Sequence, residues 1–315
     1  MRPDVQNAFK GLGVALITPF KKDGQIDFSR LSALVNRTID NGVDYLLALG
    51  TTSEYPTLAP PEKDDVLRCI LETNAKRLPV MVGLGGPNTQ FMIRKLDHLA
   101  QFDVDAILTV TPYYNKPSQA GLIAHYKTFA AATDMPVFLY NVPGRTSCNL
   151  EAATTLRIAE ECPNVVGIKE ASGMMKQILQ LIAKRPEGFL VISGDDLLTL
   201  PLMAAGADGL ISVMANAFPK KVADMVHHIM RQELDEARAI HQQLVPLTID
   251  CFKEGSPAGV KAIMSAMDLI DNALRLPLVP VSDKLQEEIV GLLRFLSQIS
   301  QIFADLHHPH RNATR

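Results

Sequence analysis

The stretch Val165-Val166-Gly167-Ile168-Lys169 is the most informative part of this 315-residue sequence. It is a short apolar run of the kind that forms a parallel strand covered on both faces, but it ends in a lysine. Comparable runs recur at intervals of roughly 25 to 30 residues. Alternation of such strands with helices predicts an α/β fold, a closed (β/α)8 TIM barrel. The runs are Gly13–Thr18, Tyr45–Gly50, Val80–Gly85, Ala106–Thr111, Val137–Asn141, Val165–Lys169, Leu190–Gly194 and Gly209–Val213.

The segments between these runs have apolar residues at helical spacing. Thr89 and Ser118 are expected to cap two of the helices. An open, doubly wound sheet is the alternative fold, but no G-x-G-x-x-G motif follows a strand and opens a helix. We interpret the glycine-rich stretch Gly83–Gly86 as a tight turn. The expected helices are Phe28–Asp40, Glu62–Arg77, Thr89–Gln101, Ser118–Thr133, Leu150–Glu161, Met174–Lys184 and Asp196–Gly206.

The strand pattern stops after Val213, and amphipathic helical segments follow it. This change predicts a catalytic barrel over residues 1–218 and a C-terminal helical extension over residues 219–306. Residues 307–315 contain a histidine-rich stretch, which we expect to be a disordered tail rather than a metal site.

Composition excludes several classes of function. The 31 basic and 34 acidic residues are spread along the chain and no basic block exists, so nucleic acid is not an expected partner. No apolar run approaches the length of a membrane helix, and we expect a cytoplasmic protein with no membrane partner. Four widely separated cysteines fit neither a metal site nor a disulfide framework, and we expect no metal and no cofactor.

Lys169 is the first candidate for chemistry. Active sites of barrel enzymes lie at the C-terminal ends of the strands, where this lysine is expected. Strict alternation places Val165, Gly167 and Lys169 inside the barrel, with the residues between them facing the helices. Burial lowers the pKa of a lysine and yields the neutral amine that attacks a carbonyl carbon. The alternative is a structural lysine paired with Asp195 or Glu170, and periodicity alone does not decide between them.

Other strand ends supply suitable partners for this amine. Gly50–Glu54 offers hydroxyls and backbone N–H groups that could hold a small carboxylate. Thr111–Asn115 contains two adjacent tyrosines, and Tyr140–Thr146 combines a phenol with a guanidinium. A hydrogen-bonded tyrosine can transfer protons, and arginine binds carboxylates through two parallel hydrogen bonds.

The ordered set of these motifs resembles the dihydrodipicolinate synthase family of pyruvate-dependent class I aldolases. The resemblance runs from about Gly11 to Leu276. It implies a lyase that condenses pyruvate with L-aspartate 4-semialdehyde in diaminopimelate and lysine biosynthesis, and that assembles as a homotetramer, a dimer of dimers. The motifs are Gly50–Glu54, Tyr113–Pro117, Tyr140–Thr146, Gly167–Ser172, Ser193–Asp196 and Gly209–Val213.

The same resemblance implies roles for individual residues. Lys169 would form the imine with pyruvate, and Tyr140 would transfer protons through Thr51 to Tyr114, which in the family reaches across a dimer interface. The substrate-binding residues would divide the carboxylates between them: Thr52 and the backbone of Ile211 would hold that of pyruvate, and Arg145 that of the second substrate.

The sequence departs from the family pattern at two places. Ser53 stands where the family usually has glycine, a change that we do not expect to abolish activity. The aligned positions of the family's lysine-inhibition pocket hold Tyr55, Pro56, Pro60, Lys63, Pro87 and Phe91, and of that pocket only Tyr113 is kept. Because Phe91 replaces an acidic partner of the lysine amine, we expect weak or absent feedback inhibition.

Two alternative functions remain open. One is another aldolase of the superfamily, such as N-acetylneuraminate lyase or a keto-sugar-acid aldolase, although Arg145 favours the semialdehyde. The other belongs to a different class, a barrel that binds a keto acid without turning it over. An imine-forming lysine with a proton relay argues against it, because binding alone requires neither.

Overall fold

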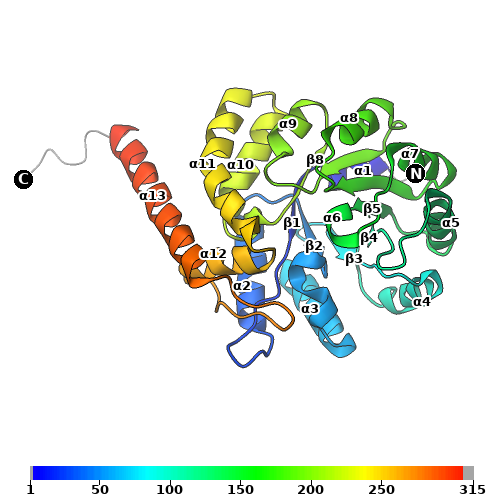
Figure 1. The fold of residues 1–315 in the computed structure, drawn as a ribbon, viewed down its shortest axis with the longest axis horizontal. Helices are drawn as coiled ribbons and strands as arrows, with labels where there is room; N and C mark the ends of the chain where they lie inside the picture. Colours follow the sequence, from blue (N-terminus) through cyan, green and yellow to red (C-terminus); the bar gives the residue numbers. More distant parts are fainter. Residues whose placement is uncertain (1–2, 308–315) are drawn as a thin grey trace, which may run out of the picture.

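The computed structural model describes residues 3–307, and in them eight parallel strands close into a barrel in the order β1 to β8. The helices form a ring around it (Figure 1). This confirms the predicted (β/α)8 TIM barrel. The strands are β1 (Gly11–Ala15), β2 (Tyr45–Ala48), β3 (Val80–Gly83), β4 (Ala106–Val110), β5 (Val137–Asn141), β6 (Val165–Glu170), β7 (Leu190–Ser193) and β8 (Gly209–Ser212).

The helices that follow the strands turn an apolar face to the barrel and a polar face to solvent. In α2, for example, Leu31, Leu34 and Val35 are buried. The helices of the ring are α2 (Phe28–Asp40), α3 (Pro60–Asn74), α4 (Thr89–Leu99), α5 (Gln119–Ala130), α7 (Ala152–Glu161), α8 (Met175–Lys184), α9 (Thr199–Ala204) and α10 (Pro219–Met230).

Two local predictions about helix and strand ends are wrong. Thr89 does not cap α4, because the side chain of Asn88 accepts the hydrogen bond from the backbone of Phe91 at 3.0 Å. Strand β1 begins and ends before the predicted Gly13–Thr18, because Asp44 binds the N–H of Leu12 and fixes the start of the strand. The prediction for Ser118 is confirmed, since its hydroxyl accepts from Gly121 at 3.3 Å.

Strand β6 does not alternate strictly. Val165 packs in the outer core against the helices, whereas Val166 packs inside the barrel, the reverse of the prediction. The cause is a register shift: Val137 pairs with Val165, but the next residue pairs with Gly167. Such a bulge reverses the faces of the residues before it and leaves those after it in place. Lys169 therefore still points into the barrel.

A helix that the spacing of apolar residues did not predict closes the barrel at the N-terminal ends of its strands. Helix α1 (Pro3–Ala8) lies behind the strands in Figure 1. The Phe9 ring that follows it packs edge-on against Tyr45 and Phe138, at centroid distances of 5.2 and 5.3 Å. This aromatic cluster fills the interior, so the space left for a ligand lies at the C-terminal ends of the strands.

Helix α10 contacts β1 and α2, so it occupies the position of the barrel's eighth helix. Helices α11 (Leu234–Lys253), α12 (Ala258–Ala266) and α13 (Asp283–His307) follow it, and α13 extends away from the barrel (Figure 1). The expected division at residue 218 would separate α10 from the barrel, and we propose to place it before Leu234 instead. The expected tail lies, from residue 308 onward, outside the described residues. In residues 3–307 no helix is both long and apolar enough to cross a membrane.

Candidate active site

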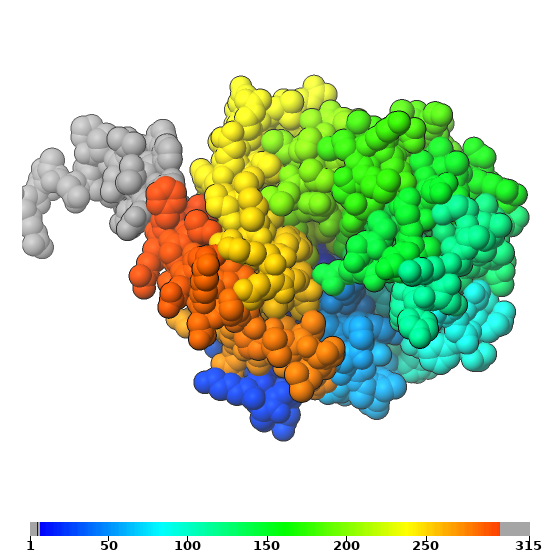
Figure 2. Space-filling view, viewed as in Figure 1, coloured from blue at the N-terminus to red at the C-terminus, as the bar shows by residue number. Residues whose placement is uncertain are grey.

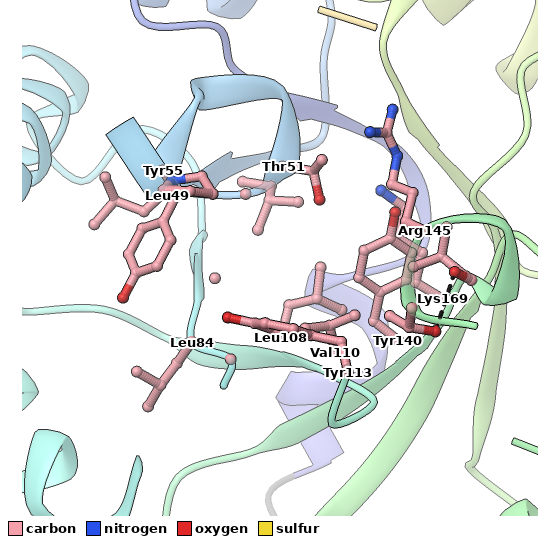
Figure 3. Close-up of a pocket in the computed structure, with 17 residues that line it drawn as sticks. Leu49, Thr51, Tyr55, Leu84, Leu108, Val110, Tyr113, Tyr140, Arg145 and Lys169 are labelled. Carbon is pink, nitrogen blue, oxygen red and sulfur yellow. Dashed lines mark hydrogen bonds between the residues drawn. The ribbon is translucent and has the colours of Figure 1, made fainter. Parts of the chain in front are cut away.

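A cavity of about 260 Å³ opens at the C-terminal ends of strands β2 to β6. Four of the predicted site residues line it together: Thr51, Tyr140, Arg145 and Lys169 (Figure 3). Thr51 and Lys169 are more than a hundred positions apart in the sequence, and the closed barrel brings them to one place. The remaining lining is largely apolar, so the polar groups act in a poorly solvated space.

Lys169 is a buried amine on a rigid strand. Its side chain is 5% exposed, and burial lowers its pKa to about 8, while Asp196 opposes this shift and Arg145 adds to it. The two carboxylates considered as partners are engaged elsewhere. Glu170 accepts hydrogen bonds from Asn141, Gln177 and Ser172, and Asp195 accepts them from two backbone amides. These contacts argue against the structural alternative for Lys169.

The path of the Lys169 side chain depends on Gly194, at the end of β7. A Cβ at Gly194 would lie 2.9 Å from Cε and 3.1 Å from Cγ of Lys169. Both distances are shorter than van der Waals contact, and Ala171 would be touched as well at 2.8 Å. Glycine is therefore required here for a close approach, and not for an unusual backbone angle.

Tyr140 lies next to Lys169, because the two residues are paired across β5 and β6. The lysine Nζ is 4.6 Å from the centre of the phenol ring. Burial raises the pKa of Tyr140, while Arg145 and a hydrogen bond with Thr51 oppose the rise. The phenol therefore stays protonated at neutral pH and can donate a proton to a group held by the amine.

Thr51 and Thr52 lie on a short 3-10 turn, Thr51–Ser53, that follows β2. Ser53, the departure from the family pattern, is buried, and its hydroxyl donates to the carbonyl of Gly50 at 2.7 Å. Its backbone is not in the left-handed region, so a glycine is not needed for its conformation. The serine thus stabilises the turn instead of distorting it.

Arg145 lies on α6 (Pro143–Thr146), an additional turn after β5. Its Nη2 donates to the carbonyl of Ser256 at 3.0 Å, a contact with the C-terminal helical region. The guanidinium lowers the pKa of both Lys169 and Tyr140, so it makes the cavity electropositive. A cavity of this kind favours substrates that carry carboxylates.

Asp196 is a residue of the site to which the sequence assigned no role. Its buried carboxylate accepts hydrogen bonds from the hydroxyl of Ser212 and from the backbone of Val213, and it attracts Lys169. Burial raises its pKa, and these hydrogen bonds oppose the rise. The Ser193–Asp196 motif was a signal for this residue, but which of its two aspartates faces the lysine depends on the three-dimensional arrangement.

Three predicted site residues do not line the cavity. Thr52 and Ile211 are buried beside it, with Ile211 paired to Gly13 on β1. Tyr114 is 92% exposed and has a backbone φ of 73°, in the left-handed region. Its neighbour Tyr113 lines the cavity instead. Within a single chain, the side chain of Tyr114 thus faces solvent.

Comparisons with known proteins agree on one family. The sequence model of the Dihydrodipicolinate synthetase family matches residues 8–296. The 4-hydroxy-tetrahydrodipicolinate synthase of Azobacteroides pseudotrichonymphae is 48% identical over 294 residues, which cover 93% of this chain and 99% of that protein.

Solved structures give the same result. The dihydrodipicolinate synthase of Thermotoga maritima is 39% identical, with a TM-score of 0.90 and coverage of 92% of this chain and 99% of that one. A structure described as a monomeric dihydrodipicolinate synthase variant is 38% identical, also with a TM-score of 0.90, and covers 93% and 99%. The chain described here therefore belongs to the dihydrodipicolinate synthetase family.

Proposed function

We propose that this chain is a 4-hydroxy-tetrahydrodipicolinate synthase that condenses pyruvate with L-aspartate 4-semialdehyde through an imine on Lys169. The observation that carries the proposal is the buried amine of Lys169, with its pKa lowered to about 8, beside a protonated phenol in an electropositive cavity. The identity to synthases over nearly the whole chain supports the same reaction.

The reaction begins at Nζ of Lys169. The neutral amine attacks the keto carbon of pyruvate, and loss of water, with uptake of one proton from the phenol of Tyr140, gives a protonated imine. The imine withdraws electrons from the neighbouring methyl group, which loses a proton and leaves an enamine. The enamine carbon forms the new bond to the aldehyde carbon of the semialdehyde, whose oxygen takes up a proton. The amine of that substrate then attacks the imine carbon, closes the ring and releases Lys169.

Tyr140 is placed to supply and remove these protons. Its phenol lies next to the amine and shares the cavity lining with Thr51, which lowers the pKa of the phenol. In the proposed relay Thr51 passes the proton on to Tyr114 of a second copy of the chain, since Tyr114 is exposed within its own chain. This arrangement requires at least a dimer, and we propose the homotetramer that the family resemblance implies.

The carboxylates of the substrates are divided between two sides of the cavity. We assign the carboxylate of pyruvate to Thr52 and the backbone of Ile211, and that of the semialdehyde to Arg145. The contact between Arg145 and Ser256 holds the guanidinium in the lining of the cavity, which supports its assignment to the second substrate.

Borohydride reduction in the presence of pyruvate tests the covalent step. Reduction converts the imine to a stable secondary amine, and peptide mass mapping locates it. We expect the adduct on Lys169 and its loss in Lys169→Ala. Lys220→Ala, which removes an exposed lysine of α10, is the control and should keep the adduct. An adduct on another residue, or none with wild-type protein, would overturn the mechanism.

Turnover with different aldehydes tests the second substrate. We expect condensation with aspartate semialdehyde to be much faster than aldol formation with N-acetylmannosamine. Faster turnover of the sugar would favour the N-acetylneuraminate lyase alternative. An adduct on Lys169 with no turnover of any aldehyde would instead favour a keto-acid-binding protein.

A further inference from the structure

A fully buried ion pair lies behind the turn that carries Thr51 and Thr52. Nζ of Lys261, on α12, donates to Oε1 of Glu54 at 2.5 Å, and both side chains are 0% exposed. The two residues are 207 positions apart in the sequence. A buried ion pair is costly to desolvate and can often be replaced by apolar residues without loss of stability. A contribution to the stability of the fold therefore does not explain why this ion pair is present.

Glu54 is attached directly to the turn. Its backbone N–H donates to the carbonyl of Thr51 at 3.1 Å, and its carbonyl accepts from Thr57 at 2.8 Å. Its φ of 56° is in the left-handed region, which a glutamate rarely occupies and which must be held by the surrounding structure. The side chain of Glu54 is the part of this residue that reaches outside the turn.

The other end of the contact is anchored in the C-terminal region. Oε2 of Glu54 accepts from the backbone of Arg275 at 3.0 Å, and Lys261 also donates to the carbonyl of Ala273 at 3.0 Å. Figure 2 shows the orange segment that contains Arg275 lying against the blue N-terminal part of the chain. Arg275 adds two hydrogen bonds to Glu62 of α3, at 2.7 and 2.6 Å.

Both cations also contact the ring of Phe20, which is buried just after β1. Nζ of Lys261 lies 4.2 Å from the ring centre, and the guanidinium carbon of Arg275 lies 4.5 Å from it. These cation–π contacts fix the position of Lys261 without offering it a second carboxylate. The carboxylate of Glu54 is thus held by groups that belong to the C-terminal helical region.

We propose that Glu54 and Lys261 are positioning residues, which hold the Thr51–Ser53 turn so that the hydroxyl of Thr51 meets the phenol of Tyr140. The inference rests on the proposed function, because it concerns the proton relay of that reaction. It assigns to the C-terminal helical region a role at the site that is separate from its contact with Arg145.

The consequence is a separation between the amount of imine at equilibrium and the rates of proton transfer. The amount at equilibrium with saturating pyruvate depends on the amine of Lys169, which lies on β6, because a proton relay changes rates and not equilibria. The rates at which the methyl proton is removed and the aldehyde oxygen is protonated depend on the contact between Thr51 and Tyr140. A displaced turn should therefore slow the proton-transfer steps and leave the amount of adduct at equilibrium nearly intact when pyruvate is saturating.

The main test uses the double variant E54Q/K261M, which removes both charges and leaves neither buried ion unpaired. Three quantities are measured: thermal stability, borohydride trapping of pyruvate, and exchange of the pyruvate methyl protons in D2O. We expect the amount trapped at equilibrium with saturating pyruvate to stay within about two-fold of wild type. Exchange and kcat should be lowered about tenfold or more, because proton transfer by a positioned group contributes at least this much. KM for pyruvate should rise, because Thr52, which we assign to the pyruvate carboxylate, lies on the same turn.

Two further variants complete the experiment. E54D keeps the charge but shortens the side chain, and like E54Q/K261M it should lower the exchange rate. K253M/E288Q removes an exposed ion pair between α11 and α13, whose Nζ–Oε2 distance is also 2.5 Å, and serves as the control with unchanged rates. If E54Q/K261M does not fold, E54D provides the decisive measurement.

The outcomes separate the inference from the proposed function. If the wild-type protein gives no adduct on Lys169, both fail together. If it gives the adduct and turns over, but folded E54Q/K261M or E54D shows wild-type exchange and kcat, the positioning role alone is overturned. If trapping and exchange both fall only as much as the fraction of folded protein falls, the ion pair is purely structural. This result would also overturn the positioning role.

Discussion

At the scale of single residues, Lys169 combines a reactive group with an unfavourable environment. Its amine is buried inside the barrel, and its pKa is lowered to about 8. The sequence predicted the burial and the direction of this shift, because the lysine ends an apolar strand. It did not predict the size of the shift, because this depends on the distances to Asp196 and Arg145.

The lowered pKa predicts how imine formation depends on pH. Below about pH 8 the amine is mainly protonated and unreactive, and above it mainly neutral. The neutral fraction therefore rises about five-fold between pH 7 and pH 8 and changes little above pH 9. We expect kcat/KM for pyruvate, and the initial rate of borohydride trapping, to follow this rise. A flat profile from pH 6 to pH 9 would contradict the assignment.

A variant of Arg145 checks the cause of the shift. The guanidinium disfavours the protonated amine, so Arg145→Leu should move the rise to higher pH. Trapping of pyruvate is the suitable readout, since Arg145 is assigned to the other substrate. An unchanged midpoint would mean that Arg145 does not contribute to the pKa of Lys169.

Gly194 gives a second prediction at the same scale. Gly194→Ala would place a methyl group 2.9 Å from Cε of Lys169, so the lysine side chain must leave its present position. We expect kcat to fall by about 100-fold or more, because small displacements of a reacting group have effects of this size. Gly291→Ala on α13, where an added Cβ meets nothing within 4 Å, is the control.

At the scale of elements, the eight strands could be predicted from the sequence, but the bulge in β6 and the turn of α6 could not. Each of the eight strands overlaps its predicted run, because buried parallel strands are short, apolar and evenly spaced. The bulge in β6 escaped prediction, since Val165 and Val166 are equally apolar and either could face the core. The turn of α6 was missed for a different reason: its Pro143–Thr146 sequence looks like an ordinary loop.

Positively charged side chains of α3 and α4 lie at or next to the positions aligned with the family's lysine-inhibition pocket. Nζ of Lys63 lies 3.9 Å from the ring centre of Tyr55, and Lys95 donates to the Tyr55 hydroxyl at 2.9 Å. Nζ of Lys95 also lies 4.6 Å from the Phe91 ring. Two cations thus occupy a region where an inhibitory lysine would need an acidic partner, so its ammonium would be repelled.

We therefore expect L-lysine not to inhibit the enzyme at sub-millimolar concentrations. Activity is titrated with L-lysine at low ionic strength, where repulsion between charges is least screened. Sub-millimolar half-inhibition would contradict the prediction. The double variant Lys63→Glu/Lys95→Glu, which reverses both charges, tests whether repulsion is the reason.

At the scale of the whole molecule, the chain is one closed barrel with further helices packed on it. The eight strands and their ring of helices end at α10, and the later helices pack on this unit. Their contact with the site could not be read from the sequence. Glu54 and Lys261 are separated by 207 positions, and nothing in the spacing of either residue indicates the other. The two residues meet only because the folded chain packs α12 against the turn that follows β2.

The position of Tyr114 leads to a prediction about the assembly. The side chain is 92% exposed in its own chain, although the proposed relay requires it at a cavity. If it serves the site of a second copy, two inactive variants should complement each other. Lys169→Ala keeps Tyr114 but has no amine, and Tyr114→Phe keeps the amine but lacks the hydroxyl.

Mixing these variants under conditions that exchange subunits creates hybrid dimers. In each hybrid, the chain with Tyr114→Phe supplies Lys169, and its partner with Lys169→Ala supplies the intact tyrosine. Random pairing makes about half of the dimers hybrid, with one restored site in each, so about a quarter of the wild-type sites should regain activity. If Tyr114 acted within its own chain, no site would contain both groups, and the mixture would stay as inactive as its components.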